Sequence, residues 1–258
     1  MAEPDATSRG TFVWREIMSE DPARTIEFYT RLFGWTAEET DMGDQGTYTV
    51  LKAGDRAVAG AMGHVGESHV PAYWLAYVSV ADVDEAAARA AASGGAVLVP
   101  GTDIPDMGRF AVVRDPQGAF VAVYAHGGEE PPPPGEPGAG EFCWDELTTP
   151  DPDGASPFYA GLLGWEARSG DPNLGRRYWT FTAAGRDAAG MMAMPPGQPF
   201  PPFWLSYVIV ADVDTAAARA SELGGAVRVP PAEIPGLGHF AVLADPHGAL
   251  FGIFAAPA

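Results

Sequence analysis

The chain has 258 residues, 47% of them hydrophobic, which is enough to bury a substantial core and excludes a disordered protein. Its 15 basic and 34 acidic residues give a formal net charge of −19, which disfavours nucleic acid and anionic membranes as partners. One cysteine, Cys143, excludes an intramolecular disulfide, and no apolar run reaches the roughly 20 residues of a membrane span.

The first half opens with a segment of alternating character. Residues 11–18 predict a strand, and Asp21 followed by Pro22 predicts a helix that Gly34 ends after Phe33. Short strands are expected at residues 47–53 and 57–62. The local pattern of this segment is therefore βαβββ.

The same order then restarts within the first half. Residues 73–80 predict a strand, and Asp82 with Glu85 forms an approximate capping box for a helix through residues 86–92. Strands follow at residues 97–99, 110–114 and 119–124. The turn Asp115-Pro-Gln-Gly joins the last two strands, so we assign Asp115 to the turn.

The second half repeats the first at an offset of 130 residues. Trp14 and Glu16 recur as Trp144 and Glu146, and WLAYVSVADVD at residues 74–84 recurs as WLSYVIVADVD at residues 204–214. This period is too long for a solenoid and predicts two homologous domains. Pro157 has no counterpart in the first half and is expected to delay or kink the corresponding helix.

A segment rich in proline and glycine separates the two halves. Four consecutive prolines favour an extended chain that does not pack, so residues 127–139 are predicted to be a linker. The predicted domains are residues 10–126 and 140–258. Because a complete pair of modules precedes the linker, we expect the two modules of each half to pair with each other; pairing of modules from opposite halves is the alternative, since members of the superfamily resembled below rearrange their modules.

This order of elements resembles a known family. The FYxxLxGW pattern at residues 28–35 and the DPxGA pattern at residues 115–119 are similar to those of the vicinal oxygen chelate superfamily, which includes glyoxalase I, bleomycin-resistance proteins and extradiol dioxygenases. The resemblance covers nearly the whole chain and implies an α+β fold with two tandem domains, each an eight-stranded cup of two βαβββ modules. Within the superfamily, the chain resembles tandem-domain glyoxalase-like proteins of actinobacteria.

The resemblance also implies where a divalent metal would bind. The ligand positions of metal-dependent members fall on Trp14, Leu75 and Ala122 in one half and on Trp144, Leu205 and Gly252 in the other, with a further ligand near Tyr48 or Tyr178. None of these side chains is a suitable donor for an octahedral ion, so we expect no metal and no cofactor. We expect the histidines to be surface residues: His64, His69, His126, His239 and His247. His239 is the exception of most interest, because it replaces Arg109 across the repeat.

Strand alternation places Trp14 and Glu16 on one face, which the resemblance makes the lining of the cup. The lining is then apolar and aromatic and suits a flat hydrophobic ligand with a polar edge. The expected ligand-binding residues are Phe12, Trp14, Met18, Tyr77, Tyr124, Phe142, Trp144, Tyr207 and His239.

Glu16 and Glu146 are the candidate catalytic residues. A carboxylate in an aromatic cup is expected to have a raised pKa, which suits a general acid or base. A structural role, with each Glu bonded to a neighbouring group at a strand end, is the alternative interpretation. Trp14 and Trp144 likewise have two interpretations: each either packs in the core or contacts the ligand.

Three functions compete on these observations. The first is a protein of the bleomycin-resistance kind that binds a hydrophobic or aromatic small metabolite without a metal. The second is a metal-independent lyase, isomerase or cyclase that uses Glu16 or Glu146, and the third, a metal-dependent glyoxalase or dioxygenase, is disfavoured by the missing ligands. We expect a cytoplasmic protein, a monomer or weak homodimer, whose partner is a small molecule and neither nucleic acid nor membrane.

Overall fold

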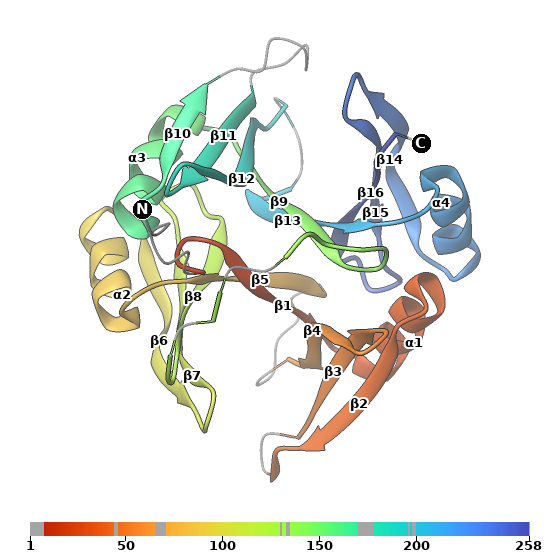
Figure 1. Cartoon of the computed structure of the whole chain (residues 1–258), viewed down its shortest axis with the longest axis horizontal. Helices are drawn as coiled ribbons and strands as arrows, with labels where there is room; N and C mark the ends of the chain where they lie inside the picture. Colours follow the sequence, from red (N-terminus) through yellow and green to blue (C-terminus); the bar gives the residue numbers. More distant parts are fainter. Residues whose placement is uncertain are drawn as a thin grey trace, which may run out of the picture. The chain divides into compact units, whose positions relative to one another are not determined.

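A computed structural model shows how the repeats fold. It describes residues 8–43, 46–64, 71–129, 131–132, 135–169, 178–195, 197 and 200–257. His69 and parts of the predicted linker lie outside these ranges. The elements are drawn in Figure 1.

Sixteen strands of the described chain form two eight-stranded sheets with the same topology. The first has the order β2-β3-β4-β1-β5-β8-β7-β6 and the second β10-β11-β12-β9-β13-β16-β15-β14. The strands of the first sheet are β1 (Phe12–Ser19), β2 (Thr36–Asp41), β3 (Thr47–Ala53), β4 (Arg56–Gly63), β5 (Tyr73–Ser79), β6 (Ala96–Ile104), β7 (Gly108–Arg114) and β8 (Phe120–His126). Those of the second are β9 (Phe142–Thr149), β10 (Glu166–Ser169), β11 (Tyr178–Ala183), β12 (Arg186–Ala193), β13 (Phe203–Ile209), β14 (Ala226–Ile234), β15 (Gly238–Ala244) and β16 (Leu250–Ala255).

In each of the four modules, one helix follows the first strand. These helices are α1 (Pro22–Phe33), α2 (Val83–Ala92), α3 (Pro152–Leu163) and α4 (Val213–Glu222). Their starts follow from the sequence, because the Asp21 side chain accepts from Arg24 N and the Asp82 side chain accepts from Glu85 N. Gly34 ends α1 in the left-handed conformation, as predicted, with φ of 73°.

The α+β class and the two eight-stranded sheets built from βαβββ modules are confirmed. The predicted delay of the third helix was wrong. Helix α3 begins at Pro152 and contains Pro157, and the Asp151 side chain caps it by accepting from Gly154 N. None of the described helices has the length and apolar character that crossing a lipid bilayer demands.

The compact units of the molecule do not follow the two halves of the sequence. Unit 1 contains residues 1–13, 76–135 and 145–204, and unit 2 contains residues 14–75, 136–144 and 205–258. Each unit thus combines one module from the first half of the chain with one from the second. Hydrogen-bonded sheets pair modules within a half, whereas the compact units pair modules across the halves.

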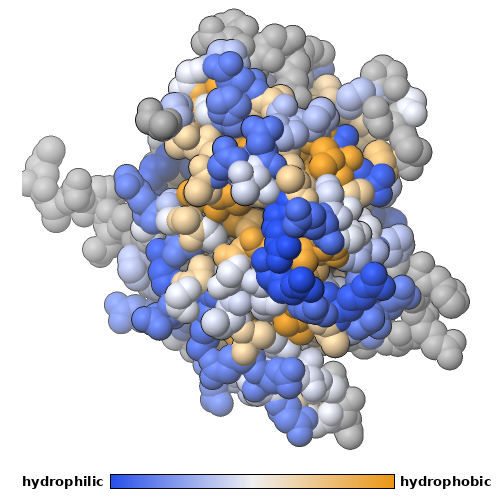
Figure 2. All heavy atoms as spheres, turned by 90° about the vertical axis from the view of Figure 1, so that its right-hand side faces the viewer, coloured by the Kyte–Doolittle hydropathy of each residue, from blue (hydrophilic) through white to orange (hydrophobic). Residues whose placement is uncertain are grey.

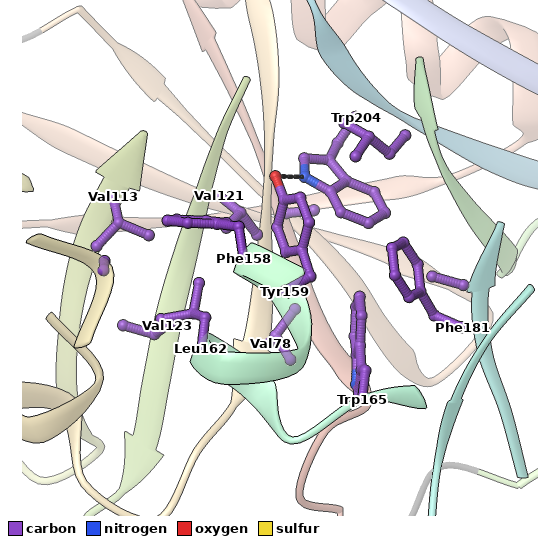
Figure 3. Packing of buried hydrophobic residues seen from close by; sticks show 14 of the residues in the cluster. Val78, Val113, Val121, Val123, Phe158, Tyr159, Leu162, Trp165, Phe181 and Trp204 are labelled. Carbon is purple, nitrogen blue, oxygen red and sulfur yellow. Dashed lines mark hydrogen bonds between the residues drawn. The ribbon is translucent and has the colours of Figure 1, made fainter. Parts of the chain in front are cut away.

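Unit 1 has an aromatic core between its two modules. Helices α2 and α3 contact each other, and Trp165 and Trp204 pack against Phe12. Figure 3 shows Phe158, Tyr159 and Leu162 of α3 among the valines of β5, β7 and β8. These residues are largely inaccessible to water, so the hydrophobic effect holds the two modules together.

Unit 2 repeats this arrangement with the other two modules. Helices α1 and α4 contact each other, and Phe28 and Tyr29 of α1 pack against Phe251 of β16. Trp35 and Trp74 pack against Phe142. The tryptophan of each FYxxLxGW pattern also bonds a glycine before β1 or β9: Trp165 Nε1 donates to Gly10 O at 2.8 Å, and Trp35 Nε1 donates to Gly140 O at 2.7 Å.

A buried triad of Tyr, Asp and Trp joins the FY and DPxG motifs in each unit. In unit 1 the Tyr159 hydroxyl donates to Asp115 Oδ2 at 2.9 Å and accepts from Trp204 Nε1 at 3.0 Å. The Asp115 Oδ1 atom accepts from the backbone N–H groups of residues 117–119, so the predicted turn role is present. In unit 2 the Tyr29 hydroxyl lies 3.3 Å from Asp245 Oδ2 and accepts from Trp74 Nε1 at 2.8 Å.

The triads make the fold sensitive to alkaline pH. Burial, followed by the charge of the paired aspartate, raises the pKa of Tyr29 and Tyr159 well above the ordinary value of 10.0. A raised pKa in the folded state means that this stability is present below pH 10 and is lost as the pH rises further. We therefore expect tyrosinate absorbance to rise cooperatively with loss of the circular dichroism signal above pH 10. The protein in concentrated guanidinium chloride should instead titrate gradually, and gradual titration of all eight tyrosines near pH 10 while the protein stays folded would contradict the burial.

The exposed large hydrophobic side chains of the described chain include several near the outermost strands. In unit 1 they include Val97, Leu98 and Met107, and in unit 2 Val227, Val229 and Leu237. Strands β6 and β14 are both interrupted by register shifts, which discourage further pairing at a sheet edge. On the face drawn in Figure 2, the hydrophobic areas are small and are separated by hydrophilic residues.

Candidate functional site

The candidate site lies in unit 2 and is centred on Glu16. This residue is on β1 next to β4, with Gly60 as its register partner, and only 7% of its surface is exposed. Burying a carboxylate is costly unless hydrogen bonds compensate for the lost water. The surroundings of Glu16 therefore decide whether it is an ordinary core residue.

Tyr48 of β3 supplies one of these bonds. Its hydroxyl is hydrogen-bonded to the Glu16 carboxylate, and it accepts from Trp14 Nε1 at 3.0 Å. The three side chains therefore form a chain in which Trp14 donates to Tyr48 and Tyr48 donates to Glu16. Such chains polarise each other and fix the direction of every donor.

Tyr73 completes the cluster at the start of β5. Burial, and then the charge of Glu16, raise the pKa of both Tyr73 and Tyr48 above the ordinary value of 10.0. Both hydroxyls therefore remain protonated at neutral pH. The side chains of Trp14, Tyr48 and Tyr73 are only partly buried, whereas Glu16 is buried, so the cluster combines a buried carboxylate with partly exposed aromatic side chains.

The second half carries the same residue types at most of these positions. Glu146 of β9 is buried and lies opposite Gly190 of β12, as Glu16 lies opposite Gly60. Trp144 and Tyr178 are partly buried, and Phe203 replaces Tyr73 across the repeat. The two halves are therefore similar at this position but not identical.

Two of the predicted ligand-binding residues pack with core aromatic side chains: Phe12 lies in the core of unit 1, and the partly buried Phe142 packs against the core of unit 2. Phe12 is 5% exposed and packs against Trp165 and Trp204 with ring centroids 5.9 and 5.3 Å apart. Phe142 packs against Trp35 and Trp74, and the Arg15 guanidinium lies over its ring. Simple alternation along β1 placed Phe12 on the face of Glu16, but its aromatic partners bring it into the core of unit 1. Phe12 and Phe142 are therefore not members of the cluster around Glu16.

The remaining predicted residues lie in several places. Met18 is buried on β1 opposite Met62, whereas Tyr77 lies on β5 opposite Ala122 with its ring 6.0 Å from Phe110. The Tyr124 hydroxyl donates to Met107 O at 2.7 Å, and burial raises its pKa. Tyr207 is buried over Gly252 in unit 2.

His239 is exposed on β15 and does not line an aromatic surface. Two acidic residues are its neighbours: Glu233 of β14 is its register partner, and the pKa of Asp212 is lowered by hydrogen bonds from Thr215 and, to a smaller extent, by His239. Arg109, at the same position of the first half, bonds Asp84 and Asp103. His239 therefore occupies the position of a surface cation.

The positions that correspond to the family's metal ligands do not fit a metal. Trp14, Leu75 and Ala122 lie on β1, β5 and β8, and none of these side chains offers an oxygen or nitrogen donor that a divalent ion would accept. Among the residues that the structure describes, no group of three or more His, Cys, Asp and Glu side chains is arranged to hold an ion. We therefore assign no role to a metal at these positions.

Among the described residues, unit 1 has two surface hollows that the residues of the Glu16 cluster do not line. One of about 600 Å³ is lined by the β6–β7 turn and the end of β8, including Asp103, Met107 and His126. The other, of about 260 Å³, lies beside the turn that contains Asp115. Both are open to solvent and neither contains a predicted catalytic residue, so Glu16 and its neighbours remain the candidate.

Sequence patterns did not indicate Tyr48, Tyr73 and Gly60 as members of the site. In the sequence, Tyr48 marks only the region where a further metal ligand of the family would be expected. Its position in the alternating strand 47–53, with Tyr178 at the equivalent place in the repeat, was the available signal. No pattern in the sequence pointed to Gly60, because its role depends on which side chains approach it.

Comparison with known proteins agrees with the architecture. Residues 11–123 match the family model of the Glyoxalase/Bleomycin resistance protein/Dioxygenase superfamily, and residues 141–254 match that of a Glyoxalase-like domain. CFP32 of Mycobacterium tuberculosis, which is named as a glyoxylase, is 34% identical over 254 residues, covering 95% of this chain and 94% of its own. The anthracycline biosynthesis protein DnrV of Streptomyces peucetius is 33% identical over 259 residues, covering 95% and 92%.

Solved structures show the same fold at low sequence identity. A 2,3-dioxygenase from Pseudomonas aligns with a TM-score of 0.64 and 17% identity, covering 99% of this chain and 94% of its own. A Mn(II)-bound glyoxalase from Novosphingobium aromaticivorans aligns with a TM-score of 0.64 and 16% identity, covering 96% and 83%. The resemblance seen in the sequence is thus confirmed, and the chain belongs to the glyoxalase, bleomycin resistance protein and dioxygenase superfamily.

Proposed function

We propose that the protein binds a small hydrophobic or aromatic molecule at the cluster of Trp14, Glu16, Tyr48 and Tyr73. The observation that carries this proposal is the buried Glu16 carboxylate, which interacts with Tyr48 and Tyr73 in a cluster with three partly exposed aromatic side chains. Small-molecule sites are mostly apolar surfaces with a few placed polar groups that orient the ligand. The cluster has this composition.

The composition of the cluster supports a ligand role. Glu16 is a buried carboxylate whose burial the hydroxyl of Tyr48 helps to compensate, and partly exposed aromatic side chains lie beside it. Partly exposed Trp and Tyr rings offer stacking surface, and an aromatic pair contributes roughly 0.5–1.5 kcal/mol beyond its area. A planar ligand with a polar edge matches both features.

The relatives support this class of ligand. The name of DnrV connects that protein with the biosynthesis of anthracyclines, which are planar polycyclic aromatic compounds. We carry over to this chain only the chemical class, a planar aromatic molecule with polar substituents. We further propose that the protein acts in the cytoplasm as a monomer or weak homodimer.

Replacement of Trp14 tests the binding proposal. Trp14→Ala removes the stacking surface and the donor to Tyr48, so we expect the Kd for a planar aromatic probe such as naphthol to rise about tenfold or more. The measurement is isothermal titration calorimetry, with Trp144→Ala as the matched variant of the second half and thermal melting as the check on folding. Unchanged affinity in a folded Trp14→Ala variant would contradict the proposal.

A metal-independent enzyme is the second candidate, because Glu16 and the hydrogen-bonded Tyr48 form a pair between which a proton can be held. In such an enzyme Glu16 would accept or return a proton during isomerisation, cyclisation or a lyase step. Glu16→Gln separates the two functions: an enzyme loses turnover with little change in ligand affinity, whereas a binding protein loses affinity and has no turnover. Glu146→Gln provides the same comparison for the second half.

A further inference from the structure

The methionines of the chain differ widely in their exposure to solvent. The sequence has eight, all of which except Met1 lie in the described ranges, and Met107 is the most exposed of these at 59%. Met42 follows at 42%, whereas Met18 and Met191 are buried, with 8% and 0% of their surface exposed. A reagent dissolved in water therefore reaches Met107 more easily than any other methionine that the structure describes.

Met107 lies on the turn between β6 and β7, which hydrogen bonds of its own backbone hold in place. Its N–H donates to Ile104 O at 3.1 Å, and its carbonyl oxygen accepts from the Tyr124 hydroxyl at 2.7 Å and from Gly127 N at 2.9 Å. None of these three bonds involves the Met107 side chain. A chemical change at the sulfur atom therefore leaves the bonds of the turn intact.

The Met107 side chain also borders the larger surface hollow of unit 1. Ile104, Pro105 and Met107 form the apolar part of the wall of this hollow, which has a volume of about 600 Å³ and is open to solvent. Leu237 takes the place of Met107 in the second half and is 52% exposed. A large apolar side chain is thus exposed on the equivalent turn of both halves, but only the one in the first half contains sulfur.

We propose that Met107 is a reversible oxidation site, at which hydrogen peroxide or an organic hydroperoxide converts the thioether into the sulfoxide. The sulfur lone pair forms a bond to one oxygen of the peroxide and the O–O bond breaks. The other oxygen takes up the proton and leaves as water or as an alcohol, so the sulfur loses two electrons and the peroxide gains them. Methionine sulfoxide reductases return the sulfoxide to the thioether with electrons from a thiol.

Oxidation at this position changes the surface of unit 1 and leaves its core unchanged. A sulfoxide is polar, whereas the thioether that it replaces is apolar, so the wall of the hollow loses part of its apolar character. The same reaction at the buried Met191 would place a polar group in the core of unit 1. The site does not depend on the cluster around Glu16, so it stands apart from the proposed function.

Timed exposure of the folded protein to hydrogen peroxide, followed by peptide mapping with mass spectrometry, measures the rate at each methionine. We expect sulfoxide to form first at Met107 and then at Met42, and to form at Met18 and Met191 at least about tenfold more slowly than at Met107. Met107→Leu should abolish the first oxidation event, and Met42→Leu is the matched control that should keep it. Oxidation of Met18 or Met191 as fast as that of Met107 would overturn the proposal.

The protein oxidised only at Met107 gives two further readouts. We expect its Tm to equal that of the untreated protein, and we expect it to elute earlier in hydrophobic interaction chromatography, because an exposed apolar side chain has become polar. Methionine sulfoxide reductases for both sulfoxide epimers, supplied with a thiol, should restore the original mass and elution. A lowered Tm, or a sulfoxide that the reductases reach only after unfolding, would contradict a reversible surface site.

Discussion

Residues 8–130 expressed alone should form no compact monomer, although they contain every strand of the first sheet. In unit 1 the valines of β5, β7 and β8 are covered by α3, and in unit 2 Phe28 and Tyr29 are covered by β16. The fragment lacks both coverings and would expose two apolar faces to water. Loss of this burial exceeds the marginal stability of an ordinary domain.

Circular dichroism, dye binding and analytical ultracentrifugation check this expectation. The full chain should melt cooperatively, whereas the fragment should bind a hydrophobic dye as a monomer or fold only as a dimer. Addition of residues 136–257 as a second chain should restore the cooperative transition, because it supplies the missing module of each unit. A monomeric fragment with a cooperative melting curve would contradict the prediction.

Asp115→Ala should destabilise the protein by about 3 kcal/mol or more. The substitution removes the acceptor of the Tyr159 hydroxyl and of three backbone N–H groups in a buried turn. A buried donor without a partner costs roughly 1–3 kcal/mol, and several are created at once. Chemical denaturation of the two proteins measures the difference.

Asp82→Ala is the matched control for this substitution in the same unit. Its side chain also accepts a backbone N–H, but at the exposed start of α2. Loss of such a cap costs typically about 1 kcal/mol. Equal destabilisation by the two substitutions would show that the buried bonds to Asp115 contribute no more than an exposed helix cap.

Much of the fold was predictable because its signals are local. Asp21, Asp82 and Gly34 begin or end helices through their own side chains or backbone, and alternation along residues 11–18 predicted β1. The internal repeat, together with the repeated order of elements within each half, predicted the number of modules. The delayed start predicted for α3 from Pro157 was wrong. A proline lowers helix propensity, but the cap at Asp151 and the buried face of α3 outweigh that local effect.

The contacts between distant segments were not predictable from one sequence. Nothing local shows that the Tyr159 hydroxyl bonds Asp115, or that Phe12 packs against Trp165. At the candidate site Trp14 and Glu16 were identified from alternation on β1. Tyr48 and Gly60 belong to other strands, and their roles depend on the register between β1, β3 and β4.

The pairing of modules across the halves has a consequence for how the chain can evolve. A protein with a single half would find the partners of its modules only in a second copy, so the tandem chain corresponds to a homodimer whose subunits have been joined. A substitution in a homodimer appears in both subunits, whereas the two halves of a joined chain can acquire different substitutions. The halves already differ at equivalent positions, where Tyr73 and Arg109 of one half correspond to Phe203 and His239 of the other. One half can therefore adapt to a new ligand while the other preserves the partner surface that both require.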